Sequence, residues 1–185
     1  MTLNKFNITK KIDLNAGAVG LLGVEHAAAL LEYGAMVVLI NVSESALSAA
    51  KINLATGFPN GHIVTFVMDV SKLQAILAVA QELPLQDSRV DILVNNSAIH
   101  STVKGAQGIL EISRLENFPL EQRGLEIAVG LTDAFLCSQV FGAVMALDGK
   151  RGMILNIVSD TSVFAPDQRL YKKMGWAGNS QPVKP

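Results

Sequence analysis

Short apolar runs alternate with longer segments of helical spacing, and this alternation constrains the fold more than any other feature of the chain. The runs at 36–40, 62–68, 90–96 and 152–159 are rich in Val, Ile and Leu and are apolar on both faces, as buried parallel strands are. Between them lie segments rich in Ala and Leu, in which apolar residues recur three and four positions apart. The rhythm predicts an α/β fold, an open parallel sheet with helices on both faces.

The expected helices have recognisable ends. Ser43 and Ser71 stand where N-caps are expected, and Gly34 stands where a helix should stop. A longer helix is predicted over 121–147, after a long mixed connection at 98–119.

The first strand must come from "KKIDLNAG" and lie in the middle of the sheet. Asp13 and Asn15 interrupt it with polar groups. A buried carboxylate without a partner costs several kcal/mol or shifts its pKa upward. The sequence offers no explanation for these two residues.

Size and charge narrow the class of protein. The chain has 185 residues, which predicts a single domain over 1–185. Its 15 basic and 16 acidic residues provide no basic field for nucleic acid or an anionic membrane surface. Cys137 is the single cysteine, so no internal disulfide can form. With neither a secretory h-region nor an apolar run of membrane-spanning length, a cytoplasmic location is expected.

A glycine-rich segment, "NAGAVGLLG", connects the first strand to the first helix. Gly17, Gly20 and Gly23 would let backbone N–H groups approach a pyrophosphate at the positive end of the helix. The spacing is G-x-x-G-x-x-G rather than the usual G-x-G-x-x-G. A tight turn before a packed helix therefore remains an alternative.

Polar residues follow the next two strands. Asn41 ends the second, where a side chain could contact an adenosine ribose. The nearest downstream basic residue is Lys51, so NAD(H) is favoured over NADP(H), whose 2′-phosphate needs Arg or Lys. Asp69 and Val70 close the third strand. Asp69 is either a partner for adenine or the cap of the following helix.

The fourth and fifth strands end in "NNSA" (95–98) and Ser159. The paired Asn side chains could bridge strand ends or hold a cofactor ribose, and a plain turn is the third alternative. All these residues fall at the carboxyl ends of strands, the edge where open α/β sheets bind ligands.

Taken together, "AGAVGLLG", "DV" at 69–70, "NNSA" and "LNIVSDTS" resemble the short-chain dehydrogenase/reductase family from about residue 6 to the last residue. The resemblance implies a Rossmann-type, doubly wound fold, often dimeric or tetrameric, that moves hydride between NAD(P) and a carbonyl or alcohol. The segments "SRLENFPLEQ", "GLTDAFLCSQVFG" and "APDQRLY" resemble a narrower branch linked to flagellin and surface-sugar (legionaminic-type) biosynthesis.

The resemblance also implies roles for residues. Ser159 matches the serine that hydrogen-bonds the substrate oxygen. The cofactor-binding candidates are Gly17, Gly20, Leu21, Leu22, Gly23, Asn41, Asp69, Val70, Asn96, Ser97 and Ala98. Three positions depart from the family pattern: Ala16 replaces a threonine, Leu21 replaces the middle glycine, and Gly130 replaces an asparagine of the long helix.

The family's acid/base is a tyrosine followed four residues later by a lysine, which share a helix face. Tyr171 does not fit, because Gly175 stands four positions on and Lys172 and Lys173 point elsewhere. In the sugar-pathway branch "QPVKP" lies just upstream of the tyrosine. The resemblance therefore implies a domain incomplete at its C-terminal side, without its catalytic helix and last strands.

Two functions stay open. One is an NAD(P)-dependent oxidoreductase acting on a small carbonyl or alcohol, with a sugar-like compound as one possibility. The other is a catalytically inactive nucleotide-binding fragment. The fifth strand would then be an edge strand, so the isolated chain is expected to be marginally stable or to depend on a partner, and a homo-oligomer is implied.

Overall fold

The computed structural model describes residues 7–83, 89–99, 118–147 and 151–159, together with 163, 164, 167 and 169. The described residues fall into two compact units, one drawn from 1–98 and 129–157 and the other from 99–128 and 158–185. That the whole chain is one dinucleotide-binding domain stays a prediction. The elements in chain order are β1 (Ile12–Ala16), α1 (Leu21–Glu32), β2 (Met36–Asn41), α2 (Glu44–Gly57), β3 (Ile63–Val67), α3 (Leu73–Glu82), β4 (Ile92–Asn95), α4 (Leu120–Ile127), η3 (Ala128–Thr132), α5 (Asp133–Leu147) and β5 (Met153–Asn156).

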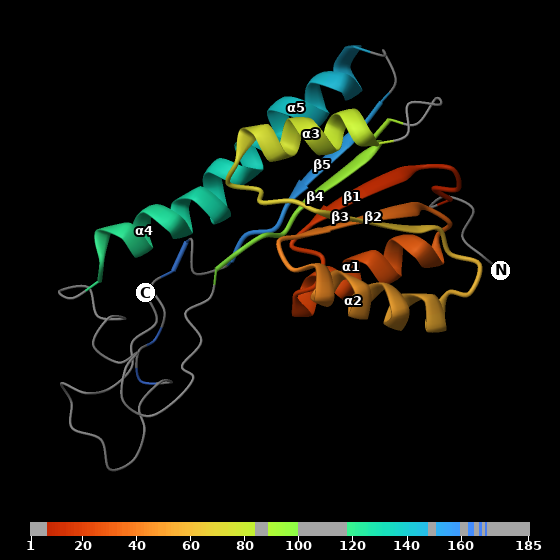
Figure 1. The fold of residues 1–185 in the computed structure, drawn as a ribbon, viewed down its shortest axis with the longest axis horizontal. Helices are drawn as coiled ribbons and strands as arrows, with labels where there is room; N and C mark the ends of the chain where they lie inside the picture. The colour runs from red at the N-terminus through yellow and green to blue at the C-terminus, as the bar shows by residue number, and fades with distance from the viewer. Residues whose placement is uncertain are drawn as a thin grey trace. The chain divides into compact units, whose positions relative to one another are not determined.

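The strands form one parallel sheet in the order β3-β2-β1-β4-β5, so β1 is central as the sequence predicted (Figure 1). Leu14 of β1 pairs with Val38 on one side and with Leu93 on the other. The strand order reverses direction at β1, because the chain winds outward to β3 and then returns to β4. This is the doubly wound arrangement of a Rossmann-type fold.

Helices cover both faces of the sheet, as predicted. Figure 1 shows α3 and α5 on one face and α1 and α2 on the other. Each face has its own apolar core: Leu14 and Val38 lie in the one that α3 and α5 cover, and Val37 and Leu39 lie in the other. Strands buried on both faces explain the continuous apolar runs of the sequence.

Two of the three helix-end predictions are confirmed. Ser43 caps α2, its Oγ accepting a hydrogen bond from Ala46 N at 3.3 Å. Gly34 follows the C-cap of α1, where Gly34 N and Ala35 N donate to the carbonyl oxygens of Leu31 and Leu30. This pair of bonds is the Schellman motif that ends many helices.

The prediction that Ser71 caps the third helix is wrong. The cap residue of α3 is Lys72, which makes no side-chain cap bond. Ser71 directly precedes this cap residue. Its N–H and its hydroxyl both donate to Asp69 Oδ1, at 2.9 and 2.7 Å. A local turn thus takes the hydroxyl that a cap would have used.

The predicted helix over 121–147 is present as α4, η3 and α5 in succession. Its middle turn, Ala128–Thr132, is a π-helix. By length and composition, Leu120–Leu147 is the one helix among the described residues that could cross a membrane. In this structure 17% of its most apolar window is buried, and α5 buries Cys137, Phe141 and Met145.

The last strand is shorter than the predicted run 152–159. β5 covers Met153–Asn156 and pairs only with β4 among the described strands, so it forms an edge of the sheet. Its apolar side chains remain accessible, with Met153 61% and Leu155 45% exposed.

Asp13 and Asn15 occupy the centre of the sheet and are fully buried. Asn15 Nδ2 donates to Gly23 O at 3.0 Å, which ties β1 to the start of α1. Neither carboxyl oxygen of Asp13 has a hydrogen-bond partner, and burial raises the pKa of Asp13 well above its usual value. No hydrogen bond offsets the effect of burial on this carboxyl.

Candidate functional site

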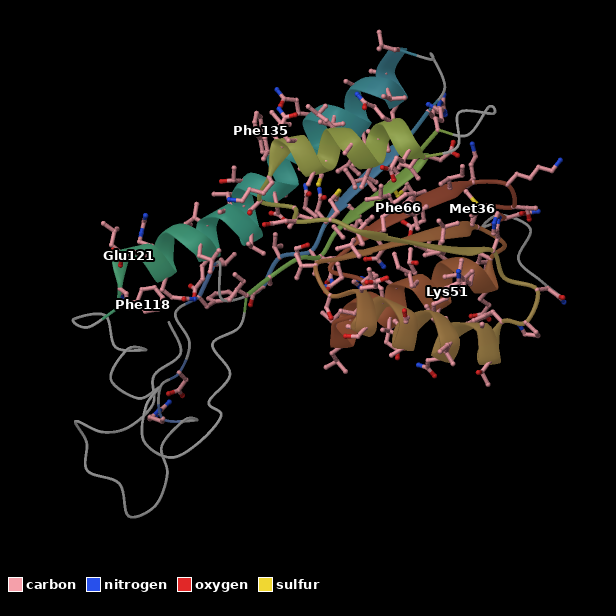
Figure 2. The ribbon with its side chains drawn as sticks, viewed as in Figure 1. Met36, Lys51, Phe66, Phe118, Glu121 and Phe135 are labelled. Atoms are coloured by element: carbon pink, nitrogen blue, oxygen red, sulfur yellow. The ribbon has the colours of Figure 1, made fainter. Side chains whose placement is uncertain are left out.

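The carboxyl ends of β1 to β4 meet at one edge of the sheet, and eleven of the twelve candidate residues lie in this unit. Figure 2 labels Met36, where β2 starts at the opposite edge, and Phe66, which pairs with Ile40 near the carboxyl ends of β3 and β2. Parallel strands bring their ends to the same edge, so segments far apart in sequence become neighbours here.

The glycine turn is built around Gly17. Its φ is +74°, a left-handed value that strongly favours glycine. A Cβ placed on Gly17 would lie 2.9 Å from Asn96 O and from Ser97 Cα and N. The missing side chain therefore lets the turn pack directly on the turn that follows β4.

Gly23, in the first turn of α1, likewise has no room for a side chain. A Cβ there would collide with the carbonyl oxygen of Gly17 and with the backbone of Ala18. Gly23 therefore lets the helix lie close against the turn. The tight-turn and phosphate-binding interpretations share this geometry.

The amino end of α1 is free of competing groups. Its cap residue is Gly20, which has no side chain that could cap the helix, and the first turn contains no acidic residue. Leu21 and Leu22 project outward, 88% and 52% exposed. The N–H groups of a first helical turn are available to an anion when no side chain caps them.

Asn41 and Asp69 both form local turns at their strand ends. Asn41 Oδ1 accepts from Ser43 N at 3.0 Å. Asp69 receives the two bonds from Ser71, which hold the pKa of its carboxyl below the usual value. Asp69 is therefore not the cap of α3. Val70 beside it is buried in the core.

The side chains of Asn95 and Asn96 bridge neighbouring segments, which is one of the three roles that the sequence left open for them. Asn95 Nδ2 donates to Asn156 Oδ1 at 2.8 Å, which joins β4 to β5. Asn96 Nδ2 donates to Gly17 O at 3.2 Å, which joins the turn after β4 to the glycine turn. These bonds do not test a contact with a ribose.

Asp133 is a member of this region that sequence reasoning missed. It is the first residue of α5, 2% exposed, and its carboxyl is hydrogen-bonded by the Ser97 side chain. Burial raises its pKa to about 6, despite hydrogen bonds from Ala134 N–H, Ser97 and its own N–H that act in the opposite direction. The signal in the sequence was an acid on the same helical stripe as Cys137 and Phe141.

Ser159 lies apart from this description. It follows β5, is exposed, and belongs to the second unit, so it is described by itself. Tyr171, Lys172, Lys173 and Gly175 fall outside the described residues.

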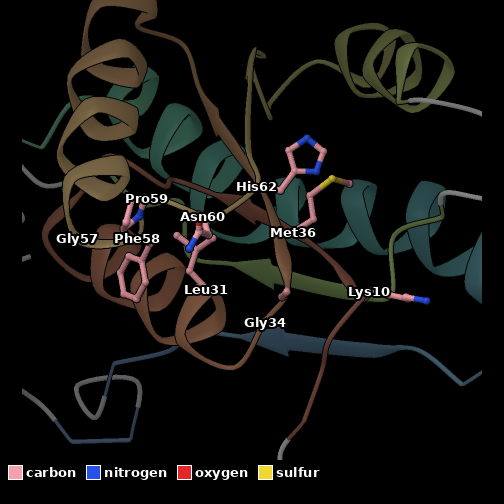
Figure 3. A pocket seen from close by; sticks show the side chains of 11 residues that line it. Lys10, Leu31, Gly34, Met36, Gly57, Phe58, Pro59, Asn60 and His62 are labelled. Atoms are coloured by element: carbon pink, nitrogen blue, oxygen red, sulfur yellow. The ribbon is translucent and has the colours of Figure 1, made fainter.

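The prominent cavity is not at this edge. A cavity of about 470 Å³ lies at the amino ends of β1 to β3 and is lined by Lys10, Gly34, Met36, Phe58 and His62, among others (Figure 3). Its lining contains Lys10 and His62 but no carboxylate, hydroxyl or thiol side chain. We place the candidate site at the carboxyl edge, because the polar side chains and the free helix end are there.

Metal chemistry finds no support in the described part of the chain, where no three His, Cys, Asp or Glu side chains gather closely enough to hold an ion. Cys137 is a buried free thiol, as expected, and its burial and the neighbouring Asp133 raise its pKa to about 12.

The strand order and the helices on both faces define a doubly wound α/β protein of Rossmann type. A family model described as short chain dehydrogenase matches residues 11–171. The chain belongs to the short-chain dehydrogenase family.

Three comparisons illustrate the relationship. The chain is 29% identical over 166 residues to the NAD-dependent glycerol dehydrogenase of Listeria innocua, covering 89% of this chain and 59% of that protein. It is 26% identical over 165 residues to the D-threitol dehydrogenase of Mycolicibacterium smegmatis, covering 89% and 58%. A solved metagenomic short-chain oxidoreductase in complex with NADP superposes with a TM-score of 0.70 at 26% identity, covering 83% and 64%. The chain thus spans about three fifths of the length of the curated relatives it matches.

Proposed function

We propose that the chain binds a nicotinamide dinucleotide at the carboxyl edge of its sheet, as part of an oxidoreductase that moves hydride between the dinucleotide and an alcohol or carbonyl substrate. The observation that carries this proposal is the junction at Gly17, where a side chain would lie 2.9 Å from the backbone of Asn96 and Ser97. It joins two turns at the point where the strand order reverses, beside the uncapped end of α1.

Each candidate residue has a place in this arrangement. The N–H groups at the start of α1 face the pyrophosphate, Asn41 faces the adenosine ribose, Asp69 and Val70 flank the adenine, and the turn after β4 contacts the second ribose. The residues of the site are Gly17, Gly20, Leu21, Leu22, Gly23, Asn41, Asp69, Val70, Asn96, Ser97 and Ala98.

NAD(H) is the favoured cofactor. A 2′-phosphate needs a basic side chain near the end of β2. Asn41 is uncharged, and the next basic residue, Lys51, lies on α2 and is exposed (Figure 2). Titration with NADH and with NADPH measures this preference, and tighter binding of NADPH would contradict it.

The substrate class is a small polyol or sugar-like alcohol. Two relatives carry the names NAD-dependent glycerol dehydrogenase and D-threitol dehydrogenase, which supports this choice. In such a reaction the alcohol carbon loses hydride and its hydroxyl loses a proton. Ser159 would donate a hydrogen bond to the substrate oxygen. The bound dinucleotide supplies the hydride acceptor.

The cytoplasm as location and a homo-oligomer as assembly state belong to the same proposal. The apolar edge at β5 supports assembly, because exposed apolar strand edges favour association. The narrower surface-sugar branch stays a prediction.

A second candidate function is non-catalytic dinucleotide binding. The observation that favours it is Gly175 at the position four residues after Tyr171, where the family's acid/base pair needs a lysine. Without a base, hydride transfer from an alcohol leaves the hydroxyl proton unaccounted for.

One experiment separates the two functions. NADH is titrated into the chain and binding is followed by nucleotide fluorescence, and NADH production is then measured with NAD⁺ and glycerol or threitol. Binding with turnover supports the oxidoreductase, whereas binding without turnover supports the second function. Absence of binding at millimolar nucleotide would contradict both.

A further inference from the structure

The cavity at the amino edge of the sheet has no part in the proposed function. Its volume is about 470 Å³, and it lies at the ends of the strands opposite the glycine turn (Figure 3). Pockets that bind small molecules have volumes of roughly 300 to 1,000 Å³. The cavity is therefore large enough to hold a small organic ligand.

Backbone hydrogen bonds join the three segments that form its walls. These segments are the residues before β1, the connection between α1 and β2, and the connection between α2 and β3. Met36 N donates to Lys11 O at 2.9 Å, which joins the first segment to the second. Val37 N donates to His62 O at 2.9 Å, which joins the second to the third. Because the walls are already fixed, a ligand does not have to order them.

The charged side chains in the lining are all basic. Lys10 and His62 line the cavity and are exposed, and Asn60 adds a side-chain amide. The neighbouring Lys11 is paired with Asp91 at 2.9 Å, whereas Lys10 has no ion-pair partner among the residues that the structure describes. With no carboxylate in the lining, these groups favour an anion.

Two helix ends act in the opposite direction. α1 and α2 both end at this cavity, and a helix carboxyl end carries about half a negative charge. Gly34 N donates to Leu31 O at 3.0 Å and Phe58 N donates to Leu54 O at 2.8 Å, so carbonyl groups at both ends already have partners. The full charge of the Lys10 ammonium group therefore outweighs these partial charges for a ligand that it contacts.

The backbone of Lys10 is a second indication of a binding site. Its φ is +66°, and it is the one non-glycine residue of the described part of the chain with a left-handed value. This conformation costs about 1 to 2 kcal/mol in an L-residue. Lys11 N, which donates to Ile8 O at 2.9 Å, holds the turn in place. Strained residues that the surrounding structure maintains are concentrated at ligand-binding positions.

The rest of the lining suits an apolar ring. Phe58 and Met36 are half-buried, and Leu31 is buried with 7% of its surface exposed. Figure 3 shows these side chains around the cavity together with His62. An aromatic ring packs favourably on a phenyl group and on a thioether sulfur. Inorganic phosphate has no group that could use this part of the lining.

We propose that the cavity binds a small aromatic carboxylate. The carboxylate accepts hydrogen bonds from Lys10 and His62, and the ring packs on Phe58 and Met36. The site lies at the edge of the sheet opposite the candidate dinucleotide site, so it does not depend on the proposed function.

The test uses 2-naphthoate as the probe and nuclear magnetic resonance of the full 185-residue chain labelled with ¹⁵N. Titration should shift the amide signals of residues 34–36 and 60–62. The neutral 2-naphthamide should bind about fivefold more weakly, because it lacks the charge that Lys10 contacts. Inorganic phosphate should bind at least about tenfold more weakly, because it lacks the ring.

Variants locate the binding site. Lys10→Gln and His62→Gln should each weaken 2-naphthoate binding by about threefold to fivefold, the effect of one exposed charged contact. Lys51→Gln is the matched control, since it removes the same charge from an exposed position on α2 outside the lining, and it should keep the full affinity. Circular dichroism checks folding, and all three changes are at exposed positions, where the cost in stability is small.

Three results would overturn the proposal. The first is the absence of shifts in these signals at about 20 mM 2-naphthoate, where a site with a millimolar Kd is nearly saturated. The second is equal affinity for 2-naphthoate and 2-naphthamide. The third is the same affinity for 2-naphthoate in Lys10→Gln, His62→Gln and Lys51→Gln. Because NADH is not used, each of these results leaves the proposed function standing, and a failure of NADH to bind leaves this proposal standing.

Discussion

Asp13 carries a buried carboxyl in the central strand, and neither of its oxygens has a hydrogen-bond partner. A buried polar group without a bond costs stability, and an ionised one costs more. Because its pKa in the folded chain is raised above the unfolded value, the folded state retains a proton that the unfolded state loses. The free energy of unfolding therefore falls as pH rises from about 4 toward the folded pKa.

Replacing this side chain should stabilise the chain. We expect Asp13→Val to raise the free energy of unfolding by about 2 kcal/mol at neutral pH, because valine suits a buried strand and leaves no unpaired group. The gain should be larger at pH 8 than at pH 4, since only the carboxyl titrates. Thermal melts at both values measure it, with Asp13→Asn as the control that removes the charge and keeps a polar group. An equal or lower melting temperature for the valine variant would contradict the prediction.

Gly17 is the residue on which the candidate site depends most directly. We expect Gly17→Ala to weaken NADH binding by about tenfold or more and to cost about 1 to 3 kcal/mol of stability, because of its positive φ and the 2.9 Å approach to Asn96 O. Fluorescence titration and a thermal melt measure the two effects.

Gly57→Ala is the matched control for this change. Gly57 is the last residue of α2, and a Cβ there meets no atom within 4 Å. It should leave binding unchanged and alter stability by less than about 1 kcal/mol. If both alanine variants bind NADH like the unmodified chain, the glycine turn does not contact the nucleotide.

At the scale of elements, β5 is the weakest part of the described sheet. Met153 and Leu155 are exposed, and the strand pairs on one side only. Ile154, on the other face, lies close to Gly142 of α5 but is itself 40% exposed. Unpaired apolar edges favour association between chains.

A charge on this strand should reduce association. We expect Leu155→Lys to lower concentration-dependent light scattering while changing the free energy of unfolding by less than about 1 kcal/mol, because lysine on an edge strand opposes pairing. Ile52→Lys is the control, since Ile52 is 69% exposed on α2 and lies on no strand edge. Equal scattering for the two lysine variants would show that the edge is not the site of association.

Local sequence patterns predicted the helices but not all of their details. Apolar spacing predicted α1, α2, α3 and the long helix, because burial of one face is encoded within a few turns. The cap of α3 was misplaced because Ser71 has two possible roles, and the competing bond to Asp69 uses the same hydroxyl. The π-helix at Ala128–Thr132 left no sequence signal that we could read.

For the whole molecule, we expect marginal stability or dependence on a partner. The exposed edge at β5, the unpaired Asp13 and the buried Asp133 each act against a stable isolated chain. Size-exclusion chromatography and a thermal melt test this expectation. A monomer that melts above about 60 °C, beyond most mesophilic domains, would contradict it.

The residues of the candidate site divide into those that the sequence identified and those that it did not. Glycine spacing and strand ends located Gly17, Asn41, Asp69 and the turn after β4, because each follows a strand whose apolar run is visible. Asn156 was missed, since it is recognisable only by its partner Asn95, which lies 61 positions earlier in the chain. Asp133 was missed although it shares a helical stripe with Cys137 and Phe141.

The sequence by itself determined a parallel sheet with helices on both faces and a glycine turn at the end of its central strand, because apolar periodicity and glycine placement act within a few residues. The tertiary structure alone decided which polar groups meet: Asn95 bonds to Asn156, Asn96 bonds to Gly17, and Asp13 has no hydrogen-bond partner. Such contacts depend on strand order and register, which bring together residues whose separation along the chain carries no pattern of its own.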